Sequence, residues 1–128
     1  MKKTAVLFLA VVLLLSISVV ALFGCSLFKG IKLDEVKSNL KNAGYEVTVM
    51  TGEEYEKWED ADPFVTTGEL ETYLYAVKGS DYIHIFFFTN NDTASYNSDI
   101  LVYPGLYSGQ SNNVIYYATK QARKDAKL

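Results

Sequence analysis

Residues that usually carry chemistry are scarce in this chain of 128 residues. Its only histidine is His84, and one histidine without cysteine partners makes a poor zinc site. The serines sit in no G-x-S-x-G elbow, and the chain has no glycine-rich loop of the kind that cradles a phosphate. We therefore predict no catalytic residue, no metal ion and no cofactor, and we expect that the chain is not an enzyme.

Positive charge is also in short supply. The chain has 12 basic and 15 acidic residues, which gives a net charge of −3. All 15 acidic residues follow Cys25, so a chain that starts there loses only Lys2 and Lys3 and has a net charge of −3 − 2 = −5. An acidic domain has no electrostatic reason to bind nucleic acid. Anionic lipid heads should repel it mildly, so we do not expect a basic patch to hold it at a membrane.

The N-terminus carries a long apolar run. Lys2 and Lys3 precede an uncharged, strongly apolar stretch over residues 4–24. Basic residues followed by an apolar run are the first two parts of an export signal. The run is also about long enough to span a membrane as a helix, which takes about 20 residues. Length alone therefore leaves a cleaved signal and a retained anchor as alternatives.

The single cysteine separates these two alternatives. Leu22, Gly24 and Cys25 match the lipobox at the end of bacterial lipoprotein signal peptides, and Phe23 departs from it. The resemblance implies that Cys25 is acylated and that cleavage after Gly24 makes it the first residue, with no thiol left for a disulfide, zinc or catalysis. Two acyl chains on one residue suffice for stable anchoring. We therefore predict a signal peptide over 1–24 and a lipid-anchored protein on the extracytoplasmic face of the cell membrane.

The rest of the chain predicts a tether over 25–32 and one small domain over 33–128. We expect an α+β fold: a four-stranded, largely antiparallel sheet with helices packed mainly on one face, preceded by a helical signal segment. The strand over 82–88 is apolar on both faces, which is typical of a central strand. In the first half of the domain, apolar spacing, caps and turns predict a helix over 34–43, a strand over 45–50, a short helix over 53–58, and strands over 70–78 and 82–88. In the second half they predict a helix that follows the capping residues 89–92 and ends at Pro104, and then a turn-rich connection over 106–113. A strand over 114–118 and a helix over 120–128 complete the prediction.

Two phrases of the domain, LKNAGYEV and VIYYATKQA, resemble small lipoproteins of Gram-positive, clostridia-like bacteria. The role of those proteins is unassigned, so this resemblance implies no catalytic motif. It agrees with the lipobox in suggesting an envelope protein.

Aromatic residues gather on the predicted hairpin. Alternation along a strand puts Tyr73 and Tyr75 on one face, and likewise Tyr82, His84 and Phe86. If the sheet is uncovered there, these five residues form a possible ligand surface whose rings stack on a sugar or pack against a peptide. The alternative is ordinary aromatic packing within the sheet, with His84 held there for packing.

Two groups of carboxylates suggest further chemistry that we do not favour. Asp81 lies three residues from His84, but residues three apart in a strand point to opposite faces and are poorly placed to pair. Calcium needs about six to eight oxygen ligands on a loop of fixed spacing, which the acidic cluster after residue 52 lacks. We predict that this cluster is a solvated face. Its members are Glu53, Glu54, Glu56, Glu59, Asp60 and Asp62.

The sequence therefore favours a non-enzymatic binding or assembly module of the cell envelope. Its expected partners are the membrane, through acylated Cys25, and an envelope protein or a glycan. An aromatic-lined module that binds glycans or peptides is the alternative, and a hydrolase-type enzyme using His84 is the third hypothesis. An exposed Tyr/His surface would favour the alternative, and a fully covered sheet would favour the first hypothesis. Titration of His84 near neutral pH, in a cleft with a carboxylate, would favour the third.

Overall fold

The computed structural model describes residues 30–128. The predicted helical signal segment lies outside these residues, as do Gly24, Cys25 and most of the predicted tether, so lipid attachment stays a prediction. Between residues 30 and 128, no helix is both long and apolar enough to cross a membrane. Residues Ile31–Leu128 form one unit with its own core.

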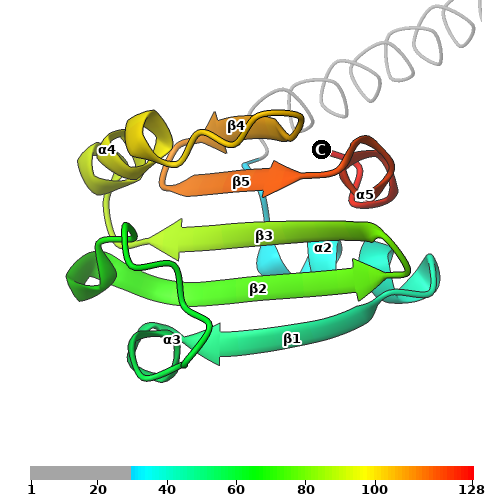
Figure 1. Cartoon of the computed structure of the whole chain (residues 1–128), viewed down its shortest axis with the longest axis horizontal. Coiled ribbons are helices and arrows are strands. Elements are labelled where there is room, and N and C mark those ends of the chain that lie inside the picture. Colours follow the sequence, from blue (N-terminus) through cyan, green and yellow to red (C-terminus); the bar gives the residue numbers. More distant parts are fainter. Residues whose placement is uncertain (1–29) are drawn as a thin grey trace, which may run out of the picture. The chain divides into compact units, whose positions relative to one another are not determined.

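One antiparallel sheet forms the middle of this unit (Figure 1). Its strands are β1 (Glu46–Thr51), β2 (Leu70–Lys78), β3 (Asp81–Phe88), β4 (Tyr107–Ser111) and β5 (Val114–Ala118). They lie in the order β1-β2-β3-β5-β4, and every neighbouring pair is antiparallel. The α+β class, the hairpin of β2 and β3, and the central position of β3 are therefore confirmed.

The prediction of four strands is wrong, because the connection over 106–113 contains β4. This segment has no apolar alternation, so its own sequence gives little sign of a strand. Pairing with the neighbouring strand β5 stabilises β4 instead. Gly109 lies opposite Tyr116, and a Cβ atom at Gly109 would come within 2.6 Å of the Tyr116 hydroxyl, so the glycine makes room for the ring. Asn112 adopts a φ of 54° in the two-residue turn, a conformation that asparagine tolerates.

Two helices, α2 (Leu33–Asn42) and α5 (Lys120–Asp125), pack against one face of the sheet. Their apolar residues recur at helical spacing and meet the alternate strand residues of that face. The resulting core consists of Val36, Leu40, Tyr45, Leu74, Ala76, Ile83, Ile85, Val114, Tyr116, Ala118, Ala122 and Ala126.

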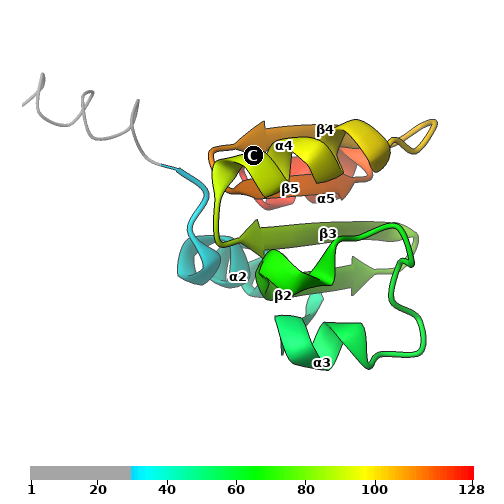
Figure 2. The ribbon, with the colours of Figure 1, turned by 90° about the vertical axis from the view of Figure 1, so that its left-hand side faces the viewer.

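The opposite face is covered in part by α3 (Gly52–Glu56), η1 (Thr67–Glu69) and α4 (Asn91–Ile100), so helices pack on both faces and not mainly on one. Figures 1 and 2 show α2 on one side of the sheet and α3 on the other. The physical reason is β3, which carries buried apolar residues on both faces and needs cover on both. The second core consists of Tyr55, Val65, Leu70, Tyr73, Phe86, Phe88, Ala94, Leu101, Ile115 and Tyr117.

Local signals set several element boundaries as predicted. The side chain of Thr51 accepts a hydrogen bond from the backbone N–H of Glu54, and the side chain of Glu54 accepts one from that of Thr51, so the two residues form a capping box at the start of α3. Gly79, with a φ of 61°, forms the tight turn between β2 and β3. The side chain of Asn90 caps α4 by accepting from the backbone of Thr93 at 2.8 Å.

Candidate functional site

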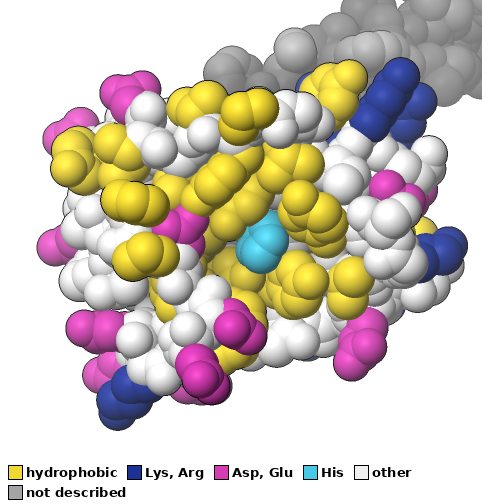
Figure 3. Space-filling view, in the orientation of Figure 1, with side chains coloured by type: hydrophobic (Ala, Val, Ile, Leu, Met, Phe, Trp, Pro, Cys, Tyr) yellow, Lys and Arg dark blue, Asp and Glu magenta, His cyan; other side chains and the backbone are white. Residues whose placement is uncertain are grey.

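The five residues of the predicted ligand surface share the sheet face that α3 and α4 cover in part. Tyr73 pairs with Phe86 across the β2–β3 ladder, and Tyr75 pairs with His84. Tyr73 and Phe86 are fully buried, whereas Tyr75, Tyr82 and His84 are half-buried. Figure 3 shows His84 in the middle of a patch of hydrophobic side chains. The prediction therefore needs a correction: Tyr73 and Phe86 form the floor beneath the surface and not part of it.

Four rings stand side by side across this face, and we call them the aromatic row: Tyr75, His84, Tyr117 and Tyr103. Ring centroids are 4.8 Å apart for Tyr75 and His84, and 4.6 Å apart for His84 and Tyr117. Tyr103 lies 4.7 Å from Tyr117. The interplanar angles of the three pairs are 33°, 27° and 45°, so neighbouring rings occupy both faces of His84 and Tyr117. The row therefore presents mainly ring edges and polar tips to a ligand.

His84 makes its hydrogen bond inward. Its Nδ1 lies 2.7 Å from the hydroxyl of Tyr73. Burial raises the pKa of Tyr73 far above its usual value, so the phenol stays protonated. The buried hydroxyl has no other hydrogen-bond partner among the described residues, which favours a hydrogen bond from this O–H to Nδ1. Burial also lowers the pKa of His84 to about 4, against a smaller opposing effect of Asp62. His84 is therefore neutral at pH 7, with its own proton on Nε2, which has no hydrogen-bond partner among the described residues.

Asp62 links two loops beside the aromatic row. One carboxylate oxygen accepts a hydrogen bond from the hydroxyl of Tyr103, and the other accepts one from the backbone N–H of Phe64 at 2.9 Å. The backbone N–H of Asp62 donates to the hydroxyl of Tyr55 at 2.8 Å. The acidic cluster is therefore not uniformly a solvated face. Its other five members are exposed as predicted, but Asp62 is half-buried and belongs to the site.

Burial keeps the phenols around Asp62 protonated. It raises the pKa of Tyr103 to about 12, and the Asp62 carboxylate adds to the effect. It raises the pKa of Tyr55 to about 12 as well, although the hydrogen bond from the Asp62 backbone acts in the opposite direction. Burial raises the pKa of Tyr117 still further. These hydroxyls are therefore neutral donors and acceptors at physiological pH.

Large apolar side chains stand exposed next to the Asp62 link. Phe64 is 71% exposed and Val102 is 68% exposed. Phe64 carries the N–H that Asp62 binds, and Val102 directly precedes Tyr103, so both residues adjoin this link. Exposed apolar side chains that border a half-buried aromatic patch are typical of an interaction site. We call the whole set the aromatic surface; it consists of the aromatic row with Tyr82, Asp62, Phe64 and Val102.

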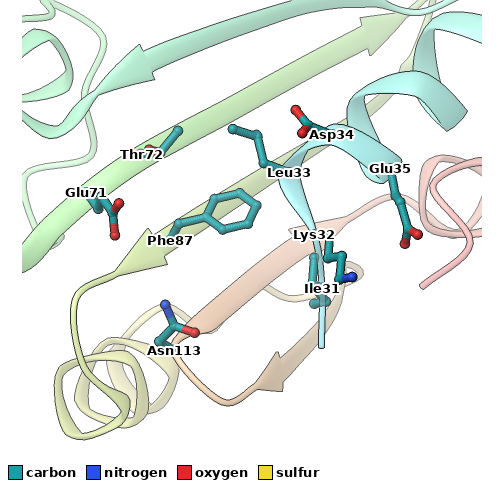
Figure 4. Close-up of a pocket in the computed structure, with 9 residues that line it drawn as sticks. All are labelled: Ile31, Lys32, Leu33, Asp34, Glu35, Glu71, Thr72, Phe87 and Asn113. Carbon is teal, nitrogen blue, oxygen red and sulfur yellow. The ribbon is translucent and has the colours of Figure 1, made fainter. Parts of the chain in front are cut away.

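A separate cavity of about 410 Å³ lies at the start of α2, against the opposite face of the sheet (Figure 4). Figure 4 shows Phe87 of β3 and Thr72 of β2 facing Leu33 at the start of the helix. The lining residues include no histidine and no cysteine. They are Ile31, Lys32, Leu33, Asp34, Glu35, Glu71, Thr72, Phe87 and Asn113.

Within the described part of the chain, no group of three or more His, Asp or Glu side chains is placed to hold a metal ion. The hydrogen-bond partner of His84 is a phenol, and Asp81 accepts from Thr119 at 3.0 Å instead of pairing with His84. A general base works best with a pKa near the working pH, and the pKa of His84 is about 4. The arrangement is thus suited to holding a ligand by apolar contacts and hydrogen bonds.

Sequence reasoning missed Asp62, Tyr103 and Tyr117. Tyr117 follows from alternation in β5, but its place beside His84 requires the β3–β5 register, which the sequence does not show. Asp62 and Tyr103 lie on irregular segments 41 residues apart. One signal was available: each directly precedes one of the chain's two prolines, which favours an extended backbone at both positions.

No protein-family model, curated protein or solved structure matches this chain. The geometry of the aromatic surface therefore carries the functional proposal.

Proposed function

We propose that this chain is a lipid-anchored lipoprotein of the cell envelope, and that its aromatic surface binds a segment of another envelope protein. One observation carries the proposal: a row of four rings, of which Tyr117 is buried and the other three are half-buried, is bordered by two apolar side chains that are about two-thirds exposed. Burying such apolar area against a partner is favourable in proportion to the area removed from water. The lipobox-like residues up to Cys25 support the envelope location.

A protein segment suits this surface better than a glycan does. Sugars stack on the faces of aromatic rings, but the faces of His84 and Tyr117 are occupied by neighbouring rings. The edges instead offer the Nε2–H of His84 and the hydroxyls of Tyr75 and Tyr82. A peptide backbone can satisfy such groups with its carbonyl and N–H groups, while its side chains pack against Phe64 and Val102.

A binding role also agrees with the chemistry of His84 better than a hydrolytic one does. Its pKa of about 4 leaves it neutral at pH 7 and weakly basic. Its Nδ1 is bound by Tyr73, and no hydroxyl or thiol nucleophile backed by a base is found beside it in the described residues. We therefore retain the non-enzymatic hypothesis and join it to the aromatic surface.

Site-specific photo-cross-linking in living cells tests the proposal. A photoreactive phenylalanine analogue is placed in the full chain at Tyr82 or at Phe64, and at exposed Val49 of β1 as the matched control. We expect one and the same protein adduct from the first two positions and none from Val49. The pair of changes Phe64→Asp and Val102→Asp should remove the adduct at Tyr82 without unfolding the chain, because both side chains are exposed.

Three outcomes would refute the protein partner. One is the absence of an adduct at both aromatic positions, and another is the same adduct at Val49. The third is an adduct that resists proteases but yields to glycan hydrolases, which would assign the surface to a glycan.

A further inference from the structure

Charge is distributed unevenly over the domain. Residues 45–118, which include the aromatic surface, contain twelve acidic and two basic side chains. Residues 36–44 and 119–128, the later part of α2 and all of α5, contain six basic side chains and one acidic. A domain whose net charge is negative thus has one positive side.

Five lysines form this positive side, and we call them the lysine cluster: Lys37, Lys41, Lys120, Lys124 and Lys127. Lys37 and Lys41 are four residues apart on α2, and Lys120 and Lys124 are four apart on α5, so each pair follows one helix face. Lys127 lies two residues beyond the end of α5, with a φ of 60°. The side chain of Asn39 donates to the carbonyl of Ala126 at 3.3 Å, which brings the two helices together. Four of the five lysines are exposed, and Lys37 is half-buried.

The carboxylates of this layer do not cancel the cluster. Asp125 accepts hydrogen bonds from the Tyr45 hydroxyl at 2.8 Å and from the Gln121 amide at 3.1 Å. Asp34 and Glu35 lie in the first turn of α2. With these two and Asp125 counted, residues 33–44 and 119–128 still contain six basic and three acidic side chains. The cluster therefore keeps an excess of positive charge at the sheet face opposite the aromatic surface.

We propose that the lysine cluster faces the anionic lipid headgroups of the membrane to which the chain is anchored, so that the aromatic surface points away from the membrane toward its partner. The inference rests on the lipid anchor of the proposed function. Charge complementarity favours it, since lysines near an anionic membrane surface are attracted and carboxylates are repelled. Attraction of the lysines and repulsion of the carboxylates favour the same orientation of the domain. The domain therefore has a preferred orientation at the membrane, even though its net negative charge gives it a low affinity for anionic lipid.

The path of the chain agrees with this orientation. Ile31, six residues after Cys25, leads directly into α2, which is part of the layer that carries the cluster. The field of the membrane falls off within about 8 Å at physiological salt. The sheet separates the two helix layers, so the aromatic surface lies on the far side of the domain when the cluster is at the membrane surface.

The test uses the acylated full chain in phosphatidylglycerol-rich vesicles that carry a headgroup quencher. Because Cys25 is the only cysteine and would be acylated, a new cysteine can be labelled alone with a fluorophore: Ser38→Cys on α2, or Phe64→Cys on the aromatic surface. We expect at least about twofold stronger quenching at position 38 than at 64. The difference should vanish in phosphatidylcholine vesicles and at about 1 M salt, where the screening length falls to about 3 Å.

A matched pair of charge reversals gives the control. Lys124→Glu and Lys57→Glu both change one exposed lysine, but only Lys124 belongs to the cluster. Lys124→Glu should reduce the quenching ratio, and Lys57→Glu should leave it unchanged. Equal quenching at both labels would overturn the inference, as would stronger quenching at position 64, which would place the exposed apolar side chains in the membrane interface. Failure to float with vesicles at about 1 M salt would refute the anchor itself and is scored separately from the ratio.

Discussion

At the scale of single residues, His84 decides between packing, binding and catalysis. Burial lowers its pKa to about 4 in the folded chain, whereas an unfolded histidine titrates near 6.5. Between these values the unfolded state binds more protons than the folded state. The contribution of neutral His84 to the free energy of unfolding is therefore complete above about pH 6.5. It declines as the pH falls toward 4, with a slope of up to about 1.4 kcal/mol per pH unit.

This sign gives the first prediction. Between pH 4.5 and 6.5, about the range set by the two pKa values, the free energy of unfolding should rise more steeply for the wild type than for His84→Gln. Urea titrations at several pH values measure both curves, and the carboxylates contribute equally to each. Parallel curves would mean that His84 titrates normally and would reopen the catalytic hypothesis.

A second prediction at this scale concerns the hydroxyl that binds Asp62. Tyr103→Phe removes the donor to a half-buried carboxylate, and hydrogen bonds to charged groups are worth about 1.5–3 kcal/mol. We expect a loss of stability in that range and faster amide exchange in residues 57–66. Tyr75→Phe is the matched control, since it removes a hydroxyl from the same row that has no hydrogen-bond partner among the described residues. Equal effects of the two changes would show that Asp62 does not hold the loops.

These residues also show where sequence reasoning ends. Alternation placed Tyr73 with Tyr75, and Tyr82 with His84 and Phe86, because a strand has a fixed period of two. The β2–β3 register brings the two sets to one face. It did not distinguish the floor from the surface, since burial depends on which loops cover each position. The Asp62–Tyr103 pair depends on two irregular segments, for which no local period exists.

At the scale of elements, the junction of α3 with β2 depends on one glycine. A Cβ atom at Gly52 would lie 1.8 Å from the carbonyl oxygen of Leu70, which is backbone and cannot swing away. Gly52→Ala should therefore cost about 3 kcal/mol or more, at the upper end of overpacking effects. Gly68→Ala is the control, because nothing lies within 4 Å of its Cβ position. Thermal unfolding compares the two, and similar melting temperatures would show that α3 moves freely.

The elements were predicted well where they carry their own signal. The two-sided apolar pattern of β3 is a local signal, and it predicted the central strand correctly. The capping box of α3 and the Gly79 turn are local signals as well. β4 was missed because its Ser-Gly-Gln composition does not favour a strand. Its hydrogen-bonded pairing with β5 stabilises the strand instead. Helices were predicted at α3 and α4, but the face of the sheet that they cover was missed, because it is set by the path of the loops.

At the scale of the whole molecule, the two faces of the sheet have different binding roles in the proposed lipoprotein. One face carries the lysine cluster at the layer where the chain enters, and the other carries the aromatic surface among acidic residues. A membrane on one side and a protein partner on the other would use both faces. This division depends on the lipid anchor, so Cys25 is the residue on which the whole arrangement rests.

The last prediction therefore concerns Cys25. Cys25→Ala should abolish incorporation of a labelled fatty acid and leave a precursor that retains residues 1–24. Membrane fractionation alone would not reveal this, because the uncleaved run over 4–24 is about long enough to hold the precursor in the bilayer as a helix. Fatty-acid labelling together with the intact mass of the purified chain separates the two forms, since processing removes 24 residues and adds acyl chains. Ser26→Ala is the matched control and should be labelled and processed like the wild type. Labelled Cys25→Ala, or a wild-type chain of unprocessed mass, would show that the chain is held in the membrane by its apolar run, and the lipoprotein hypothesis would have to be abandoned.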